Sequence, residues 1–172
     1  MAPSRIDDLK RRVLADPASI AFAQLAEEYR RAGRLQDAVS TCVAGLARHP
    51  NYLSARVTLG RAWLELGQLD AARRELAQVV AAVPDNLAAV KSLGEACRAA
   101  GATREASEWY AAALQLAPGD PDIARIVSEL ASTLAEEEET VEEGERRRAL
   151  ATIAALEGWL EAVDAARARR RA

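Results

Sequence analysis

The stretch LSARVTLGRAWLELGQLDAARRELAQVVAAVPDN, residues 53–86, decides the fold, because its pattern of residue types occurs three times in succession. The types in this copy are Leu59, Gly60, Trp63, Gly67, Ala72, Leu76 and Pro84. Similar residues stand 34 positions earlier, at Leu25, Ala26, Tyr29, Gly33, Ala38, Cys42 and Pro50. They return 34 positions later, at Leu93, Gly94, Cys97, Gly101, Ala106, Tyr110 and Pro118. A fixed period of this length is typical of repeat proteins.

The residue types explain why each copy should fold as two antiparallel helices. A small residue such as Gly60 or Ala72 lets the backbones of two helices approach closely. Gly67 and its counterparts fall between the helices, where a turn with positive φ costs glycine little. Pro84 and its counterparts end the second helix. Because one pair cannot bury its apolar faces alone, the copies are expected to stack on one another.

Period and pattern together resemble the tetratricopeptide repeat over residues 19–120. The family's first large position is kept only in part, since Phe22, Arg56 and Val90 occupy it. The resemblance implies an all-α fold, a right-handed α-solenoid of three helix pairs in residues 19–52, 53–86 and 87–120. Helices are predicted at residues 17–32, 35–48, 53–66, 69–82, 87–100 and 103–116.

Both flanks of the repeats are expected to carry capping helices. Residues 1–18 place Ile6, Leu9, Val13 and Leu14 on roughly one face, which fits an N-terminal cap over the open end of the stack. Residues 121–135 carry Ile123, Ile126, Val127, Leu130 and Leu134, which fits a C-terminal cap. Terminal repeats need such partners to cover their exposed edges.

Residues 136–145 form an acidic linker in this interpretation. They are glutamates interrupted by Thr140, Val141 and Gly144, and a block of like charges is usually solvated. One interpretation is a frayed helix end and flexible connector, since glycine also lowers helix propensity. The other is an acidic site for a basic partner or for the arginine-rich tail of the same chain.

Residues 146–172 are predicted to form an additional amphipathic helix flanked by arginines. One stripe holds Ala149, Ile153, Leu156, Leu160 and Val163, with Trp159 at its rim. Three uses remain open for this stripe: it folds back on the repeats, it binds a partner or a second copy of the chain, or it lies on an anionic membrane. The acidic residues on the polar face of this helix disfavour binding to an anionic membrane.

Composition excludes several classes of function. The formal net charge of −3 gives no overall attraction to nucleic acid or anionic lipid. The sequence has no phosphate-binding glycine loop, zinc-protease motif or nucleophile elbow, so we expect no catalytic residues, cofactor, metal or small-molecule substrate. Cys42 and Cys97 are expected to be buried small apolar residues, and His49 a surface residue. Without a signal peptide or an 18-residue apolar run, the cytoplasm is the expected location, and the Ala- and Arg-rich usage is typical of bacterial coding.

The family resemblance implies a concave groove lined by the first helix of each pair. The corresponding ligand-facing positions are Ala23, Glu27, Arg30, Arg31, Val57, Arg61, Leu64, Glu65, Lys91, Glu95, Arg98 and Ala99. Some family members hold a terminal carboxylate with a Lys/Asn clamp, but Glu27 and Arg61 occupy its asparagine positions here. The expected ligand is therefore an extended or helical protein segment.

The sequence thus predicts a noncatalytic adaptor or scaffold with a protein or peptide partner. The alternative is a nucleic-acid or membrane-surface module acting through the arginine-rich C-terminal helix, although the neighbouring glutamates argue against it. Trp109 should point away from its own helix pair, because Tyr110 fills the inward position. The helix at residues 121–135, the stripe of residues 153–160 or an external partner is expected to cover it, with one of the chain's own helices favoured. The candidate second contact surface comprises Trp109, Ile153, Leu156, Trp159, Leu160 and Val163.

Overall fold

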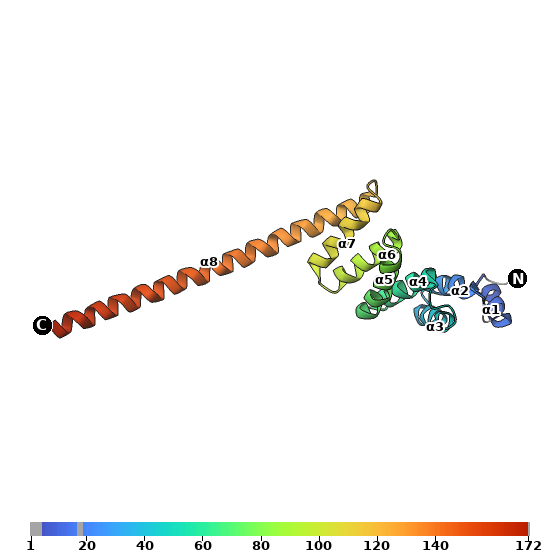
Figure 1. Cartoon of the computed structure of the whole chain (residues 1–172), viewed down its shortest axis with the longest axis horizontal. Helices are drawn as coiled ribbons and strands as arrows, with labels where there is room; N and C mark the ends of the chain where they lie inside the picture. Colours follow the sequence, from blue (N-terminus) through green and yellow to red (C-terminus); the bar gives the residue numbers. More distant parts are fainter. Residues whose placement is uncertain (1–4, 17–18, 172) are drawn as a thin grey trace. The chain divides into compact units, whose positions relative to one another are not determined.

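The computed structural model describes the backbone of residues 5–16 and 19–171 and the side chains of residues 5–16 and 19–159 (Figure 1). Over these residues the fold is all-α. In chain order the helices are α1 (Arg5–Ala15), α2 (Ala21–Arg31), α3 (Leu35–Leu46), α4 (Leu53–Glu65), α5 (Leu69–Ala82), α6 (Leu87–Ala99), α7 (Thr103–Leu116) and α8 (Pro121–Arg171). The chain divides into two compact units, residues 1–130 and 131–172. The three predicted repeats lie in the first unit as α2–α3, α4–α5 and α6–α7.

The predicted repeat helices match the observed ones to within two residues, except at the first. The prediction started that helix at Pro17, which lies outside the described residues. In the structure α2 begins at Ala21, whose backbone N–H donates to Ser19 Oγ at 3.3 Å. The start therefore lies at a local serine turn.

The glycines act as their spacing predicted. Gly33, Gly67 and Gly101 have φ of 71°, 72° and 73°, so each turn between paired helices adopts the left-handed conformation. Gly60 has a different role, because a Cβ placed there would lie 2.6 Å from Leu76 Cγ. The close crossing of α4 and α5 therefore depends on glycine at this position.

The core runs through the repeat unit as a series of adjoining apolar clusters. Leu76 and Val79 of α5 are fully buried with Leu93 and Ala96 of α6, so consecutive repeats share a core. At the N-terminal end, Leu9 of α1 packs with Leu25 and Tyr29 of α2. At the other end, Ile123 and Leu130 of α8 join the cluster of Tyr110 and Ala113. Both ends of the stack are thus covered by helices of this unit.

Trp109 differs from its prediction. It is half-buried and packs against the core cluster that residues of α5 and α6 form together, so it does not point away from the repeat core. Its Cβ lies 3.3 Å from the position that a Cβ on Gly94 would occupy. Because Gly94 has no side chain, Trp109 Cβ and the Tyr110 ring fit closely against α6. The ring also borders a hollow whose lining includes Arg73 and Ala77 of α5, the second helix of the preceding repeat.

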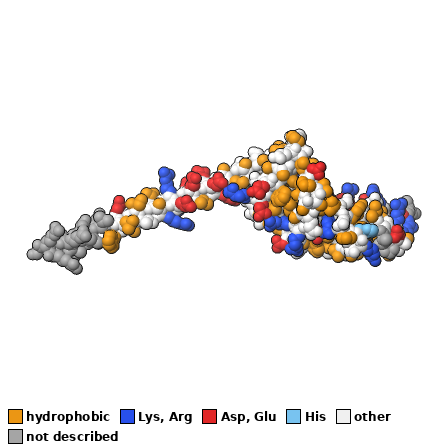
Figure 2. Space-filling view, viewed as in Figure 1, with side chains coloured by type: hydrophobic (Ala, Val, Ile, Leu, Met, Phe, Trp, Pro, Cys, Tyr) orange, Lys and Arg blue, Asp and Glu red, His pale blue; other side chains and the backbone are white. Residues whose placement is uncertain are grey.

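Residues 136–145, predicted as a flexible linker between two helices, are helical in the structure. A single helix, α8, spans the stretches predicted as the C-terminal cap, the linker and the amphipathic helix. Glutamate is a good helix former, and an isolated glycine such as Gly144 costs only about 1 kcal/mol relative to alanine. Along α8, acidic, basic and apolar side chains follow one another as separate groups (Figure 2). Among the described residues, no helix is both long and apolar enough to cross a bilayer.

Candidate protein-binding groove

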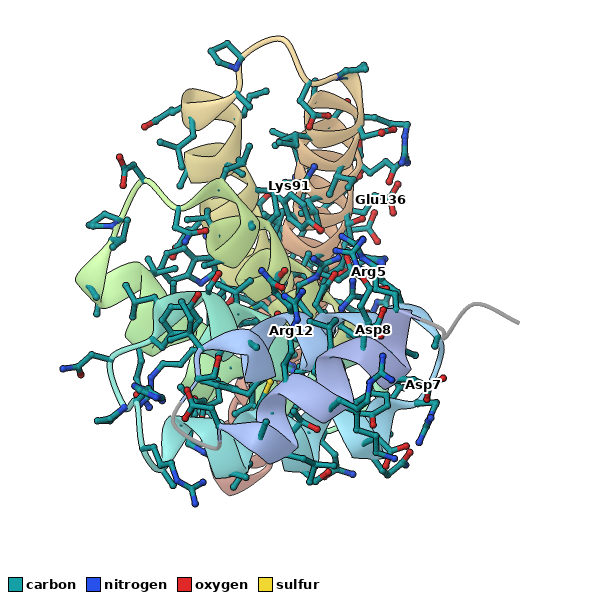
Figure 3. All side chains as sticks on the ribbon, turned by 90° about the vertical axis from the view of Figure 1, so that its right-hand side faces the viewer. Arg5, Asp7, Asp8, Arg12, Lys91 and Glu136 are labelled. Carbon is teal, nitrogen blue, oxygen red and sulfur yellow. The ribbon has the colours of Figure 1, made fainter. Side chains whose placement is uncertain are left out.

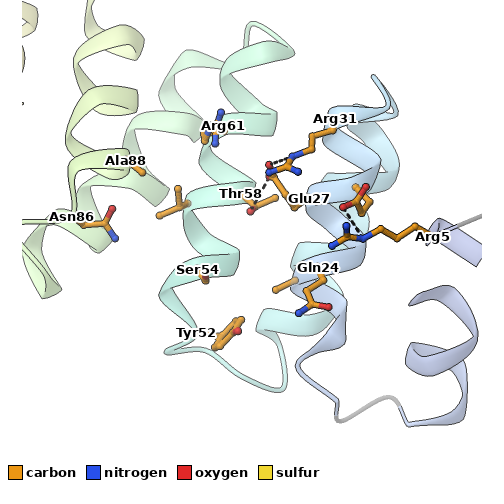
Figure 4. Close-up of a pocket in the computed structure, with 13 residues that line it drawn as sticks. Arg5, Gln24, Glu27, Arg31, Tyr52, Ser54, Thr58, Arg61, Asn86 and Ala88 are labelled. Atoms are coloured by element: carbon orange, nitrogen blue, oxygen red, sulfur yellow. Dashed lines mark hydrogen bonds and ion pairs between the residues drawn. The ribbon is translucent and has the colours of Figure 1, made fainter. Parts of the chain in front are cut away.

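Two adjoining hollows lie along the first helices of the three repeats and share Arg61. We call their combined lining the groove. The first has a volume of about 500 Å³ (Figure 4) and is lined by Arg5, Ala23, Gln24, Glu27, Glu28, Arg31, Tyr52, Ser54, Val57, Thr58, Arg61, Asn86 and Ala88. The second has a volume of about 260 Å³ and is lined by Arg61, Leu64, Glu65, Lys91, Ser92, Glu95 and Tyr110. The groove therefore passes from α2 across α4 to α6.

The structure brings most of the sequence-predicted positions to this groove. Nine of the twelve line it: Ala23, Glu27, Arg31, Val57, Arg61, Leu64, Glu65, Lys91 and Glu95. The other three, Arg30, Arg98 and Ala99, are not among the lining residues. Ala23 is buried in a core cluster with Phe22 and Ala26. Ala23 therefore forms part of the groove's floor.

Charges at the α2 end of the groove are paired within the protein. Arg30 donates two hydrogen bonds to Glu27, at 2.8 and 2.9 Å, and also pairs with Glu65 of the next repeat. Arg31 adds a further hydrogen bond to Glu27 at 2.9 Å. Hydrogen bonding to Arg30, opposed by partial burial, lowers the pKa of Glu27 to about 2. These residues hold α2 and α4 together rather than standing free for a ligand.

The charges at the α6 end are paired as well. Lys91 donates to Asp120 at 3.1 Å, and Asp120 also accepts the backbone N–H of Ile123 at 3.2 Å at the start of α8. Glu95 accepts hydrogen bonds from Arg98, at 2.6 and 2.9 Å, and from the Tyr110 hydroxyl at 2.9 Å. Hydrogen bonding to Arg98 lowers the pKa of Glu95, whereas burial raises the pKa of Tyr110.

Arg61 is the exception among the groove's cations. It is half-buried at the junction of the two hollows and forms no ion pair with any residue in the described part of the chain. Its charge contributes to lowering the pKa of Glu27, but without a hydrogen bond between them. Figure 4 shows Arg61 on α4 facing the space between α2 and α6. The groove thus presents a positive charge at its centre.

Sequence reasoning missed several lining residues that lie just before the first helices. Tyr52 and Asn86 each precede such a helix and are 34 positions apart, and Asp120 follows at the same spacing. The repeat period could therefore have identified this position. Asn86 Oδ1 accepts the backbone N–H of Ala89 at 3.1 Å and so caps α6, which leaves its amide NH₂ to donate elsewhere.

Arg5 was missed for a different reason, because it comes from α1, outside the repeats. It pairs with Glu28 of α2 at 3.1 Å and closes one end of the first hollow (Figures 3 and 4). In the sequence nothing distinguishes it from other exposed arginines. Only the packing of α1 on α2 places it at the groove.

The cysteines and the histidine do not form a reactive site. Cys42 and Cys97 are fully buried, as predicted, and burial raises the pKa of Cys42 to about 12. His49 is half-buried rather than on the surface, and it stacks on Phe22 with ring centroids 6.0 Å apart. Among the described residues, no group of three or more His, Cys, Asp or Glu side chains could hold a metal ion.

The predicted second contact surface is divided between the two units. Trp109 packs in the repeat core, as described above. Ile153, Leu156 and Trp159 lie on α8 and are exposed, whereas the side chains of Leu160 and Val163 lie outside the described residues. The six positions therefore do not form one described surface.

Comparison with known proteins agrees with this architecture. Residues 29–97 match the sequence model of the tetratricopeptide repeat. The first repeat domain of Spaghetti (RPAP3), solved bound to the HSP90 peptide SRMEEVD, is 18% identical, with a TM-score of 0.66 over 69% of this chain and 94% of that one. MamA of Desulfovibrio magneticus RS-1 is 22% identical, with a TM-score of 0.71 over 80% of this chain and 78% of that one. The second domain of human RPAP3, solved with the HSP70 peptide SGPTIEEVD, is 18% identical, with a TM-score of 0.61 over 66% of this chain and 95% of that one. No curated protein sequence is significantly similar to the chain.

Proposed function

We propose that this chain is a noncatalytic adaptor whose groove binds a segment of a partner protein, since residues 29–97 match the sequence model of the tetratricopeptide repeat. Two of the similar solved structures, the RPAP3 domains, hold chaperone peptides. The groove of this chain offers apolar area at Val57 and Ala88 and hydrogen-bonding groups at Ser54 and Asn86. That mixture suits a peptide with both apolar and polar side chains.

Arg61 is the observation that carries this proposal. The carboxylates near Arg30, Arg31, Lys91 and Arg98 are already used inside the stack, whereas Arg61 has no such partner among the described residues. A half-buried guanidinium pairs well with a carboxylate, because its planar fork donates two parallel hydrogen bonds. The partner segment therefore carries an Asp or Glu that reaches Arg61.

An internal segment suits the groove better than a free C-terminus. Glu27 stands at one of the clamp positions where some tetratricopeptide-repeat proteins have asparagine, and as a carboxylate it is ionised at neutral pH. A terminal carboxylate beside Glu27 would be repelled. An acidic side chain at Arg61 avoids that repulsion.

Capture of partners from nuclease-treated native lysate tests this function. We expect the wild-type chain to retain a protein that Arg61→Glu loses, and the retained protein's acidic peptides to bind in isolation. Arg74→Glu is the matched control, since Arg74 is an exposed arginine of α5 outside the groove. Equal capture by Arg61→Glu and wild type would exclude the groove as the binding site. Capture that disappears on nuclease treatment would instead favour the nucleic-acid alternative.

A further inference from the structure

The part of α8 beyond the repeat unit exposes large apolar side chains on a helix that is otherwise strongly charged. The exposed fractions are 52% for Ile153, 58% for Leu156 and 64% for Trp159. Leu150 is exposed to a similar extent, at 61%. Contiguous apolar exposure of this kind marks an interaction surface more often than isolated residues do.

The spacing of these residues fits pairing with another helix. Ala149, Ile153, Leu156, Leu160 and Val163 follow one another in alternating steps of four and three residues. This is the a/d pattern of a heptad, with Ile153 at an a position and Leu156 at a d position. In the same register the a positions include Glu139, Arg146 and Arg167. The d positions include Glu142 and Arg170. The seam therefore has a short apolar centre with charged layers on both sides.

The order of the charges indicates the orientation of the partner. From residue 136 onward the sequence reads acidic (136–145), basic (146–148), apolar (149–156), acidic (Glu157, Glu161, Asp164) and basic (167–171). Read from the other end, the order of blocks is the same but each charge has the opposite sign. A parallel copy would place glutamates against glutamates and arginines against arginines. An antiparallel copy places the acidic block 136–145 of one chain beside the basic block 167–171 of the other.

We propose that residues 139–171 of α8 form an antiparallel dimerisation helix whose partner is the same segment of a second copy of this chain. The contact is isologous, because both copies use the same surface. The register that sets Ile153 opposite Leu156 of the second copy also sets Ala149 opposite its Leu160. That register sets Glu142 opposite its Arg167 and Glu139 opposite its Arg170. One alignment thus pairs the central apolar layers with one another and the outermost charged layers with opposite charges, while Arg146 lies opposite Val163 between them.

Sedimentation velocity of the full chain tests the dimer. We expect a concentration-dependent dimer, with the dissociation constant raised about tenfold or more by Ile153→Glu, because a charge would enter the centre of the seam. Ala151→Glu is the matched control, since Ala151 is exposed on the opposite side of the same helix and should leave the dimer intact. A chain that remains monomeric at micromolar concentration overturns the proposal. Docking of the apolar stripe on the chain's own repeats, or its binding to anionic vesicles, would then be the alternative. Equal effects of the two substitutions overturn it as well.

Charge exchange tests the orientation. The double variants Glu139→Arg/Glu142→Arg and Arg167→Glu/Arg170→Glu should each weaken the dimer at low salt, because each places like charges opposite one another. Combining all four substitutions in one chain should restore it. In a parallel dimer each residue faces the same residue of the second copy. Like charges would therefore oppose one another in the wild type and in all three variants. Absence of weakening and rescue would therefore overturn the antiparallel arrangement.

A distance measurement provides an independent check. Nitroxides attached to Gly144→Cys would lie roughly 30 Å apart in the antiparallel dimer, since residue 144 falls 21 positions from its opposite residue at 1.5 Å per position. In a parallel dimer they would lie at the same height on the outer faces of the two helices, roughly 20 Å apart, which is the distance between the axes plus one helix radius on each side. Cys42 and Cys97 are fully buried and are labelled much more slowly than the introduced thiol. A short distance would contradict the proposal.

Discussion

At the scale of single residues, glycine determines how closely the paired helices approach. The Cβ of Gly60→Ala would lie 2.6 Å from Leu76 Cγ, and Leu76 is fully buried with little room to move. We expect Gly60→Ala to lower the free energy of unfolding by about 1–3 kcal/mol, and Gly60→Leu by more. A urea melt followed by circular dichroism measures this change. Gly119→Ala, where an added Cβ would meet nothing within 4 Å, is the control, and equal midpoints for the two variants would contradict the packing described.

The lowered pKa of Glu27 predicts how the free energy of unfolding depends on pH. Its pKa in the folded state is about 2, below the ordinary value of 4.5, so its ionised form stabilises the fold above about pH 4.5. That contribution should be lost progressively as the pH falls from 4.5 towards 2. Glu27→Gln should therefore be less stable than wild type at pH 6, with the difference shrinking in urea melts at lower pH. A difference that stays constant from pH 6 to pH 2.5 would show that the Arg30 pairing does not stabilise the fold.

The sequence identified the groove positions better than it identified their roles. Period and family resemblance located Arg30, Arg61 and Arg98 correctly on the first helices. They could not show that Arg30 pairs with Glu65 in the next repeat while Arg61 remains without a partner among the described residues. That distinction depends on side-chain geometry between helices 30 or more positions apart in the sequence. A repeat pattern contains no information on such pairings.

At the scale of helices, the repeat period predicted boundaries well because glycine and proline mark them. The same reasoning failed for residues 136–145, where like charges and Gly144 suggested a flexible connector. Neither feature breaks a helix: glutamate has high helix propensity, and Gly144 has helical neighbours on both sides. Charge repulsion acts on exposed side chains and is weakened by solvent.

Proline substitution distinguishes the helical and flexible descriptions of residues 136–145. We expect Gly144→Pro to reduce the far-ultraviolet helical signal, because proline costs about 3 kcal/mol inside a helix and removes a backbone hydrogen bond. Gly144→Ala should preserve or increase the signal. If the segment were a flexible connector, neither substitution would change the helical signal measurably.

At the scale of the whole chain, the division into two units predicts where the protein can be shortened. Residues 121–130 contribute Ile123 and Leu130 to the core that contains Tyr110. A chain ending at residue 131 should therefore keep the repeat unit folded. One ending at residue 120 would expose this core and should melt several degrees lower. Thermal melts of the two truncations measure the difference, and equal melting temperatures would show that the start of α8 is not a cap.

The two cysteines give the stack a pair of built-in reporters of local opening. Cys42 lies in α3 of the first repeat and Cys97 in α6 of the third, and both thiols are fully buried. A thiol in such a position reacts with a disulfide reagent only when its surroundings transiently open, so its reaction rate measures the free energy of that opening. Repeat arrays are held together by contacts between neighbours, so one end can open before the other. Unequal rates at Cys42 and Cys97 would then reveal, in the unmodified protein, from which end the array begins to unravel.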